Sequence, residues 1–156
     1  MDSSVVLERG TEELELLVFQ IDKKNYGINV DKIREIIRNE EVTMIPNSHP
    51  YIEGVFIPRD VIITLINLAK VLNLTQSADI SKDMLIITNF NKLNIAFRVH
   101  SLAGIHRILQ SDIMIPDKTI NNEYSSLATG IVKMNEDLII ILDYGKIISD
   151  ISSELV

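Results

Sequence analysis

The three histidines of this sequence, His49, His100 and His106, are the side chains best suited to bind a metal ion or to move a proton near neutral pH. Their positions form no local ligand motif. His100 and His106 are six residues apart, and no carboxylate backs either of them at helical spacing. We therefore expect no metal site and interpret the histidines as ordinary surface or interface residues.

Other catalytic patterns are also missing from the sequence. None of Ser48, Ser101 and Ser125 stands in the G-x-S-x-G turn that a serine nucleophile requires, and the six glycines are scattered singly instead of forming a phosphate-binding loop. The adjacent acids Glu12-Glu13 and Glu40-Glu41 are typical of solvated turns or strand edges. The sequence therefore predicts neither an enzyme nor a bound cofactor.

The composition of the 156 residues excludes further classes of protein. The absence of cysteine rules out disulfide frameworks, thiol catalysis, zinc ribbons and iron–sulfur clusters, and it suits a reducing compartment, so we expect a cytoplasmic protein. A net charge of −7 argues against nucleic acid as a partner. No apolar run approaches the roughly 18 residues of a membrane span, and the N-terminus lacks a secretory pattern, so we expect no direct membrane insertion.

Isoleucine-rich segments alternate with short turns along most of the chain, which is typical of short β-strands. We expect strands at 14–22, 26–30, 42–45, 51–57, 61–66, 84–90, 93–99, 129–134 and 138–142. Short helices are predicted at 68–72, capped by Asn67, and at 144–148, capped by Asp143. The polar stretches 73–83 and 117–126 are expected to form connections.

Two segments carry the spacing of helices instead, one of them after Asp31, which is suited to an N-cap. The apolar residues that recur there at threes and fours are Ile33, Ile36 and Ile37 in one segment and Leu102, Ile105 and Ile108 in the other. We expect helical turns there, whose side chains either pack in the core or line an exposed groove.

The two halves of the chain, 14–72 and 84–148, mirror one another, because each offers a hairpin, a helical turn, two more strands and a short helix. Short strands at turn spacings of about 8 to 12 residues favour small barrels over an open sheet. The sequence therefore predicts an all-β fold with two intertwined barrel-like lobes on a shared core, for which 14–72 and 84–148 are approximate halves, followed by a tail at 149–156.

A series of short motifs carries more information in its order than any one motif does alone. The series is Leu17-Val18-Phe19, Tyr26-Gly27-Ile28, Ile33-Arg34-Glu35-Ile36-Ile37, Ile52-Glu53-Gly54-Val55, Ile66-Asn67-Leu68, Ala96-Phe97-Arg98-Val99, Thr129-Gly130-Ile131 and Leu138-Ile139-Ile140-Ile141-Leu142-Asp143. With this order and spacing, residues 1–156 resemble a single domain of the chemotaxis coupling protein family, CheW.

The run 7–15, together with His100-Ser101 and 105–108, is more similar to the coupling domain of CheV, in which a receiver domain follows. No second domain fits before residue 156. The resemblance therefore leaves two alternatives: a CheV coupling domain whose tail at 149–156 would lead to an absent receiver, or a free-standing coupler.

The resemblance implies a fold of two five-stranded β-barrel subdomains around a common hydrophobic core. It implies no catalytic activity and no cofactor. The implied role is that of a scaffold in receptor arrays, which bridges the cytoplasmic tips of methyl-accepting chemoreceptors and the regulatory domain of the histidine kinase CheA.

The resemblance also implies contact residues on the first lobe. The family's exposed arginine in a turn between two strands falls on Arg59, its glutamate near the helical turn on Glu35, and its glycine before a strand on Gly54. Ile33 occupies the neighbouring apolar position. A strand glycine such as Gly54 can equally mark a bulge or a close backbone approach.

On the second lobe, Val99, Leu102 and Ile105 match family positions beside the receptor groove, although they fit a core equally well. The chain also departs from the family's Leu-Arg-Gly, because it has Pro58-Arg59-Asp60. If Asp60 paired with Arg59, affinity for a partner would fall slightly, since an exposed pair contributes about 0 to 1 kcal/mol.

A third alternative comes from another class of protein, a small barrel that binds a ligand or an oligosaccharide. Such a barrel needs a polar and aromatic pocket, and the 5% aromatic content counts against it.

Overall fold

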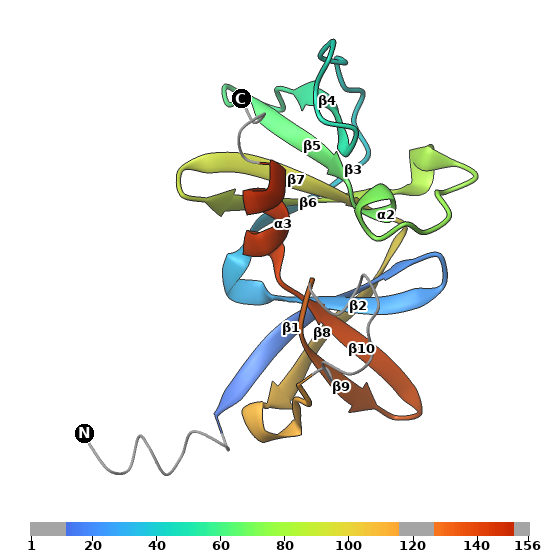
Figure 1. Ribbon diagram of the computed structural model, residues 1–156, viewed down its shortest axis with the longest axis vertical. Coiled ribbons are helices and arrows are strands. Elements are labelled where there is room, and N and C mark those ends of the chain that lie inside the picture. The colour runs from blue at the N-terminus through green and yellow to red at the C-terminus, as the bar shows by residue number, and fades with distance from the viewer. Residues whose placement is uncertain (1–11, 116–126, 152–156) are drawn as a thin grey trace.

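The computed structural model describes residues 12–115 and 127–151, which form two five-stranded sheets and two helices (Figure 1). The strands are β1 Glu13–Ile21, β2 Lys24–Asn29, β3 Ile33–Arg38, β4 Ile52–Phe56, β5 Ile63–Asn67, β6 Met84–Phe90, β7 Leu93–Val99, β8 Ser101–Leu109, β9 Ala128–Met134 and β10 Asp137–Leu142. The helices are α2 Leu68–Val71 and α3 Tyr144–Ile151, and single 3₁₀ turns lie at Val30–Lys32, Ile80–Lys82 and Gln110–Asp112.

The two sheets share one pattern of strand pairing. The first sheet has the order β8-β1-β2-β10-β9 and the second the order β3-β6-β7-β5-β4. In each, the third and fourth strands are parallel and the other neighbours are antiparallel. The all-β fold with two five-stranded lobes is therefore confirmed.

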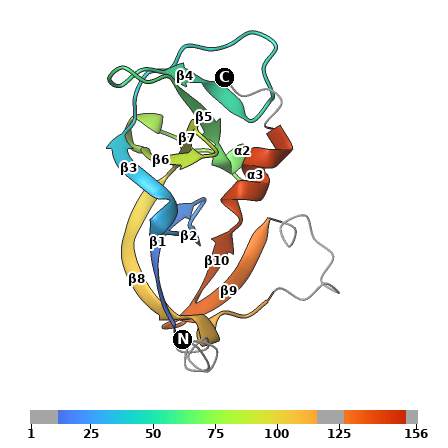
Figure 2. The same ribbon diagram turned by 90° about the vertical axis from the view of Figure 1, so that its left-hand side faces the viewer.

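The sheets divide the chain differently from the expected halves 14–72 and 84–148. The second sheet is built from one continuous segment, 33–99, whereas the first combines β1 and β2 with β8, β9 and β10. This arrangement arises because β2 pairs with β10, with Tyr26 opposite Ile140, and because β1 pairs with β8. Figure 2 shows β8 continuing from β7 of the second sheet into the first.

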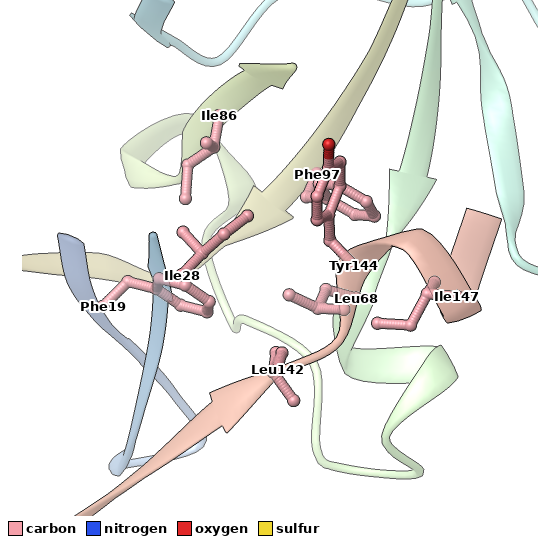
Figure 3. A pocket seen from close by; sticks show the side chains of 8 residues that line it. All are labelled: Phe19, Ile28, Leu68, Ile86, Phe97, Leu142, Tyr144 and Ile147. Carbon is pink, nitrogen blue, oxygen red and sulfur yellow. The ribbon is translucent and has the colours of Figure 1, made fainter. Parts of the chain in front are cut away.

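The shared core lies between the sheets and includes both helices. Phe19 of β1, Ile86 of β6 and Phe97 of β7 belong to one buried cluster together with α2 and α3 side chains. Figure 3 shows side chains from both sheets and both helices that meet in this core. The void between them has a volume of only about 10 Å³. Each sheet also has its own smaller apolar cluster. The alternating faces of β1 account for this, because Leu17 and Phe19 enter the shared core whereas Leu16 and Val18 enter that of the first sheet.

The prediction of two helical turns from apolar spacing is wrong, because those segments form strands β3 and β8. In each, a β-bulge shifts the register by one residue, which turns a two-residue period into a three-residue one. On β3 the irregularity lies between Ile33 and Glu35. On β8, Leu102 and Ile105 face Phe19 and Leu17, and Gly104 between them has a φ of +91°. Asp31 is not the N-cap that the sequence predicted. The cap is Asn29, whose side chain accepts a hydrogen bond from the Asp31 N–H.

The predicted helix caps are confirmed. Asn67 Oδ1 accepts the Lys70 N–H at 3.1 Å, and Asp143 Oδ1 accepts the Lys146 N–H at 3.0 Å. Helix α3 is longer than predicted and ends at Ile151, so 149–151 are not part of a tail.

Of the predicted strand 42–45, only a single bridge between Thr43 and Val55 forms. The predicted loop 117–126 and the rest of the predicted tail, 152–156, lie outside the described residues.

Candidate partner-binding surface

The turn between β4 and β5 exposes Arg59. Phe56 pairs with Ile63 at the end of the hairpin, so residues 57–62 form the connection. Pro58 restricts the backbone there, and the Arg59 side chain is 71% exposed. The sequence-based expectation of an outward arginine at this tip is therefore confirmed.

Glu35 lies on β3, which is the opposite edge strand of the same sheet from β4. Its carboxylate Oε2 accepts a hydrogen bond from Arg59 Nη2 at 2.5 Å. The partner of Arg59 is thus Glu35 and not Asp60, which had been considered from the sequence. The structure brings two contact residues that the resemblance implied into one ion pair.

A hollow of about 240 Å³ surrounds this pair. Its walls combine Arg34 and Pro58 with the apolar side chains Val61, Ile63 and Ile87. Arg34 Nη1 donates to Asn94 Oδ1 at 2.8 Å, so a second guanidinium stands beside the pair. The surface therefore combines an exposed arginine with apolar side chains, and arginine is enriched at the energetic centres of protein–protein interfaces.

The exposed apolar residues beside this hollow were missed in the sequence. Ile57 and Ile62 flank the turn and are at least half-exposed, and Val61 is partly exposed. Continued strand alternation would have revealed them, because Phe56 and Ile63 are buried and their neighbours Ile57 and Ile62 must then point outward. Met44, which is also exposed, precedes β4.

Gly54 has a structural role in β4. It stands at a register irregularity between β4 and β5, with a φ of +155°. A Cβ at this position would clash with the carbonyl oxygen of Thr43. Gly54 itself is buried, so the close backbone approach considered from the sequence accounts for the glycine.

Val99 and Ile33 take part in packing. Val99 has 0% exposure and belongs to the shared core, so it presents no surface to a partner. Ile33 is half-buried at the start of β3 and packs against the same core.

Leu102 and Ile105 form a second exposed apolar surface, this time on β8 of the first sheet. Leu102 is 38% exposed and Ile105 is 57% exposed. Because β8 is an edge strand, these side chains are open on one side. The structure thus separates the expected contact residues into two places, Glu35 and Arg59 on the second sheet and Leu102 and Ile105 on the first.

Two groups outside these surfaces have shifted pKa values. Burial raises the pKa of the Tyr144 hydroxyl above its ordinary value. Hydrogen bonds from the Ser81 hydroxyl and N–H lower the pKa of Asp79.

Within 12–115 and 127–151, no three His, Asp or Glu side chains are grouped as metal ligands would be. None of the helices in these residues is long and apolar enough to cross a lipid bilayer.

Two five-stranded sheets on a shared core, with two short helices, define the fold class of this chain. The CheW-like domain family matches residues 15–152. The chain is 30% identical over 141 residues to the chemotaxis protein CheW of Thermotoga maritima, covering 90% of this chain and 91% of that protein. It is 38% identical over 133 residues to the chemotaxis protein CheV3 of Helicobacter pylori, covering 81% of this chain and 42% of that protein. The chain therefore belongs to the CheW-like domain family.

The fold agrees with a solved structure of that family. The crystal structure of the scaffolding protein TtCheW from Thermoanaerobacter tengcongensis superposes with a TM-score of 0.77 over 85% of each chain, at 22% sequence identity. This likeness establishes the two-lobed β fold.

Proposed function

We propose that this protein is a cytoplasmic chemotaxis adaptor that couples methyl-accepting chemoreceptors to the histidine kinase CheA. The observation that carries the proposal is the Glu35–Arg59 pair, exposed at one end of the second sheet in a chain of the CheW-like domain family. Binding is the whole of the proposed biochemistry, with no catalytic step.

The Glu35–Arg59 surface binds the regulatory domain of CheA in this proposal. Arg59 bonds Glu35 through one nitrogen, and a guanidinium has further N–H donors available for a partner's carboxylate or carbonyl groups. Val61, Ile57 and Ile62 supply apolar area around the arginine. Arginine surrounded by apolar contacts is a common centre of binding energy.

The β8 surface binds the receptor tips. Leu102 and Ile105 leave apolar side chains exposed beside an open sheet edge. An amphipathic helix buries its apolar face in such a surface, which suits the helical tips of chemoreceptors. Because the two surfaces lie on different sheets, one molecule can hold both partners at once and join receptor arrays.

The comparisons agree with both forms of coupler drawn from the sequence. CheW proteins match this chain over most of both lengths, and the CheV3 match covers 81% of this chain and 42% of that protein. The proposed coupling role is the same for a free-standing CheW-type coupler and for a CheV coupling domain. Membership of the family favours an adaptor over a ligand-binding barrel.

Titration calorimetry of the chain against the isolated CheA regulatory domain tests the kinase contact. The test variant is Arg59→Ala. The matched control is Arg107→Ala, because Arg107 is 69% exposed and also pairs with carboxylates, at 3.5 Å from Glu13 and 3.9 Å from Glu15, but lies on β8 of the other sheet.

We expect binding by the parent chain, a loss of about tenfold or more in Arg59→Ala, and little change in Arg107→Ala. Unchanged affinity in Arg59→Ala would remove Arg59 from the kinase contact. No binding by the parent chain would contradict the kinase partner itself.

A further inference from the structure

A buried arginine lies at the other end of the second sheet from the Glu35–Arg59 pair. Arg98, on the central strand β7, is 5% exposed. Because side chains alternate along a strand, Arg98 lies on the same face of β7 as Ala96. Ala96 belongs to the apolar cluster of the second sheet. A buried charge requires partners, and this one has three.

Two of the three partners belong to the two edges of the sheet, and the third, Asp83, directly precedes the inner strand β6. Arg98 Nε donates to Glu53 Oε2 at 2.6 Å, and Glu53 is on the edge strand β4. Arg98 Nη1 donates to Asn39 Oδ1 at 2.7 Å, and Asn39 directly follows the other edge strand, β3. Nη1 also donates to Asp83 Oδ2 at 3.2 Å, and Asp83 is itself 2% exposed.

One guanidinium thus ties β3 to β4 across three intervening strands. The Glu35–Arg59 pair makes the same connection at the opposite ends of these two strands. Glu35 is near the start of β3 and Asn39 follows its end, whereas Glu53 is near the start of β4 and Arg59 follows its end. The distance between the two edges is therefore fixed at two points, one buried and one exposed.

We infer that Arg98 is a positioning residue for the partner-binding surface, and that its buried bonds hold β3 and β4 at the separation that lets Glu35 and Arg59 meet. The part of this inference that concerns binding rests on the function proposed above. A planar guanidinium suits the role, because its rigid fork reaches two acceptors in fixed directions. The exposed pair alone is too weak to set the geometry, since such pairs contribute little in water.

The test variant is Arg98→Lys, which keeps the positive charge that Asp83 and Glu53 need but lacks the rigid planar fork that bonds Glu53 through Nε and Asn39 through Nη1. A second variant, Asn39→Ala, cuts only the tie to β3 and leaves both carboxylates paired with Arg98. The matched control is Val132→Ala, which lowers stability from the core of the first sheet, far along the chain from this network.

The first readout needs no partner. It is the order parameter of the Arg59 Nε–H group, measured by NMR on the full chain. We expect it to fall in Arg98→Lys and Asn39→Ala and to stay unchanged in Val132→Ala. An unchanged Arg59 signal in both test variants would overturn the inference, whatever happens to the melting temperature.

The second readout is affinity for the CheA regulatory domain, which we expect to weaken about threefold or more in both test variants. The Arg59 signal can change in the two test variants while affinity stays unchanged in them and in Arg59→Ala. Arg98 would then still be the positioning residue, and the kinase contact would be refuted instead. If Arg98→Lys does not fold, the Arg59 order parameter and the affinity are both measured on Asn39→Ala.

Discussion

Glu35 and Arg59 are 24 positions apart in the chain, yet Oε2 of one and Nη2 of the other are 2.5 Å apart. Glu35 lies on one edge strand, β3, and Arg59 lies in the connection that follows the opposite edge strand, β4. A flat sheet would hold these edges on the order of 19 Å apart, given about 4.8 Å between neighbouring strands. The second sheet therefore curls, so that the connection after β4 comes within reach of β3.

Exchanging the two charges separates their role in folding from their role in binding. We predict that Glu35→Arg or Arg59→Glu alone lowers the free energy of unfolding by about 1 kcal/mol or less, and that the double exchange restores it. Affinity for the CheA regulatory domain should not return in the double variant, because the partner then faces reversed charges. Urea denaturation and calorimetry measure the two effects. Parent-like binding by the exchanged protein would show that the pair serves the fold alone.

Gly54→Ala should reduce stability, because the new Cβ meets the Thr43 carbonyl oxygen and the backbone has an unfavourable φ. We expect a loss of about 1–3 kcal/mol in urea denaturation. Gly145→Ala is the control, since it lies in α3 and its Cβ meets only the Phe90 ring and the Asp143 carboxylate, which are side chains. Equal stability of the two variants would refute the close approach at Gly54.

The local sequence predicted most strands because each apolar run is bounded by a turn. The hairpin at 84–99 and the caps Asn67 and Asp143 depend on residues a few positions apart, so the sequence alone was sufficient for them. The two false helical turns had a different origin. Bulges on β3 and β8 arise from pairing with distant strands, and their three-residue spacing imitates a helix.

The second exposed surface predicts a variant that loses one partner only. Ile105→Asp should weaken binding to a receptor-tip fragment about tenfold or more, since it places a charge in the apolar contact. Stability should change little, because Ile105 is already largely exposed. Leu138→Asp is the control, as Leu138 is similarly exposed on β10 of the same sheet. A co-sedimentation assay with the fragment compares them, and equal losses would argue against a specific site on β8.

The 3₁₀ turn at Ile80–Lys82 predicts a pH-dependent contribution from Asp79. The Ser81 hydroxyl, at 2.6 Å, and then the Ser81 N–H lower the pKa of this carboxyl. A lowered pKa in the folded state means that the ionised group stabilises the turn above the unfolded-state pKa. This contribution is lost as the pH falls through the folded-state pKa.

Carbon-13 NMR titration measures the pKa of Asp79 directly. We predict that it rises in Ser81→Ala. It should remain unchanged in Ser77→Ala, because the Ser77 hydroxyl bonds Asp83. A carboxyl that titrates identically in the parent and in Ser81→Ala would contradict the assigned cause.

The contact residues were predictable only in part. Arg59 could be placed on the surface because Pro58 and Asp60 mark a turn, but its pairing with Glu35 depends on the curl of a whole sheet. Val99 could not be assigned to the core from its own segment, since the cluster in which it is buried also includes residues of α2, α3 and β1. The Arg98 network was invisible for the same reason, because its partners are 15, 45 and 59 positions away.

The most direct test of the coupling role is whether this chain recruits CheA to receptors. Vesicles that carry chemoreceptor cytoplasmic tips are mixed with CheA, sedimented, and assayed with and without the chain. We predict that the chain increases the CheA in the pellet and that Arg59→Ala and Ile105→Asp each abolish most of the increase. If sedimentation of CheA is the same with the folded parent chain as without it, the protein does not couple these partners.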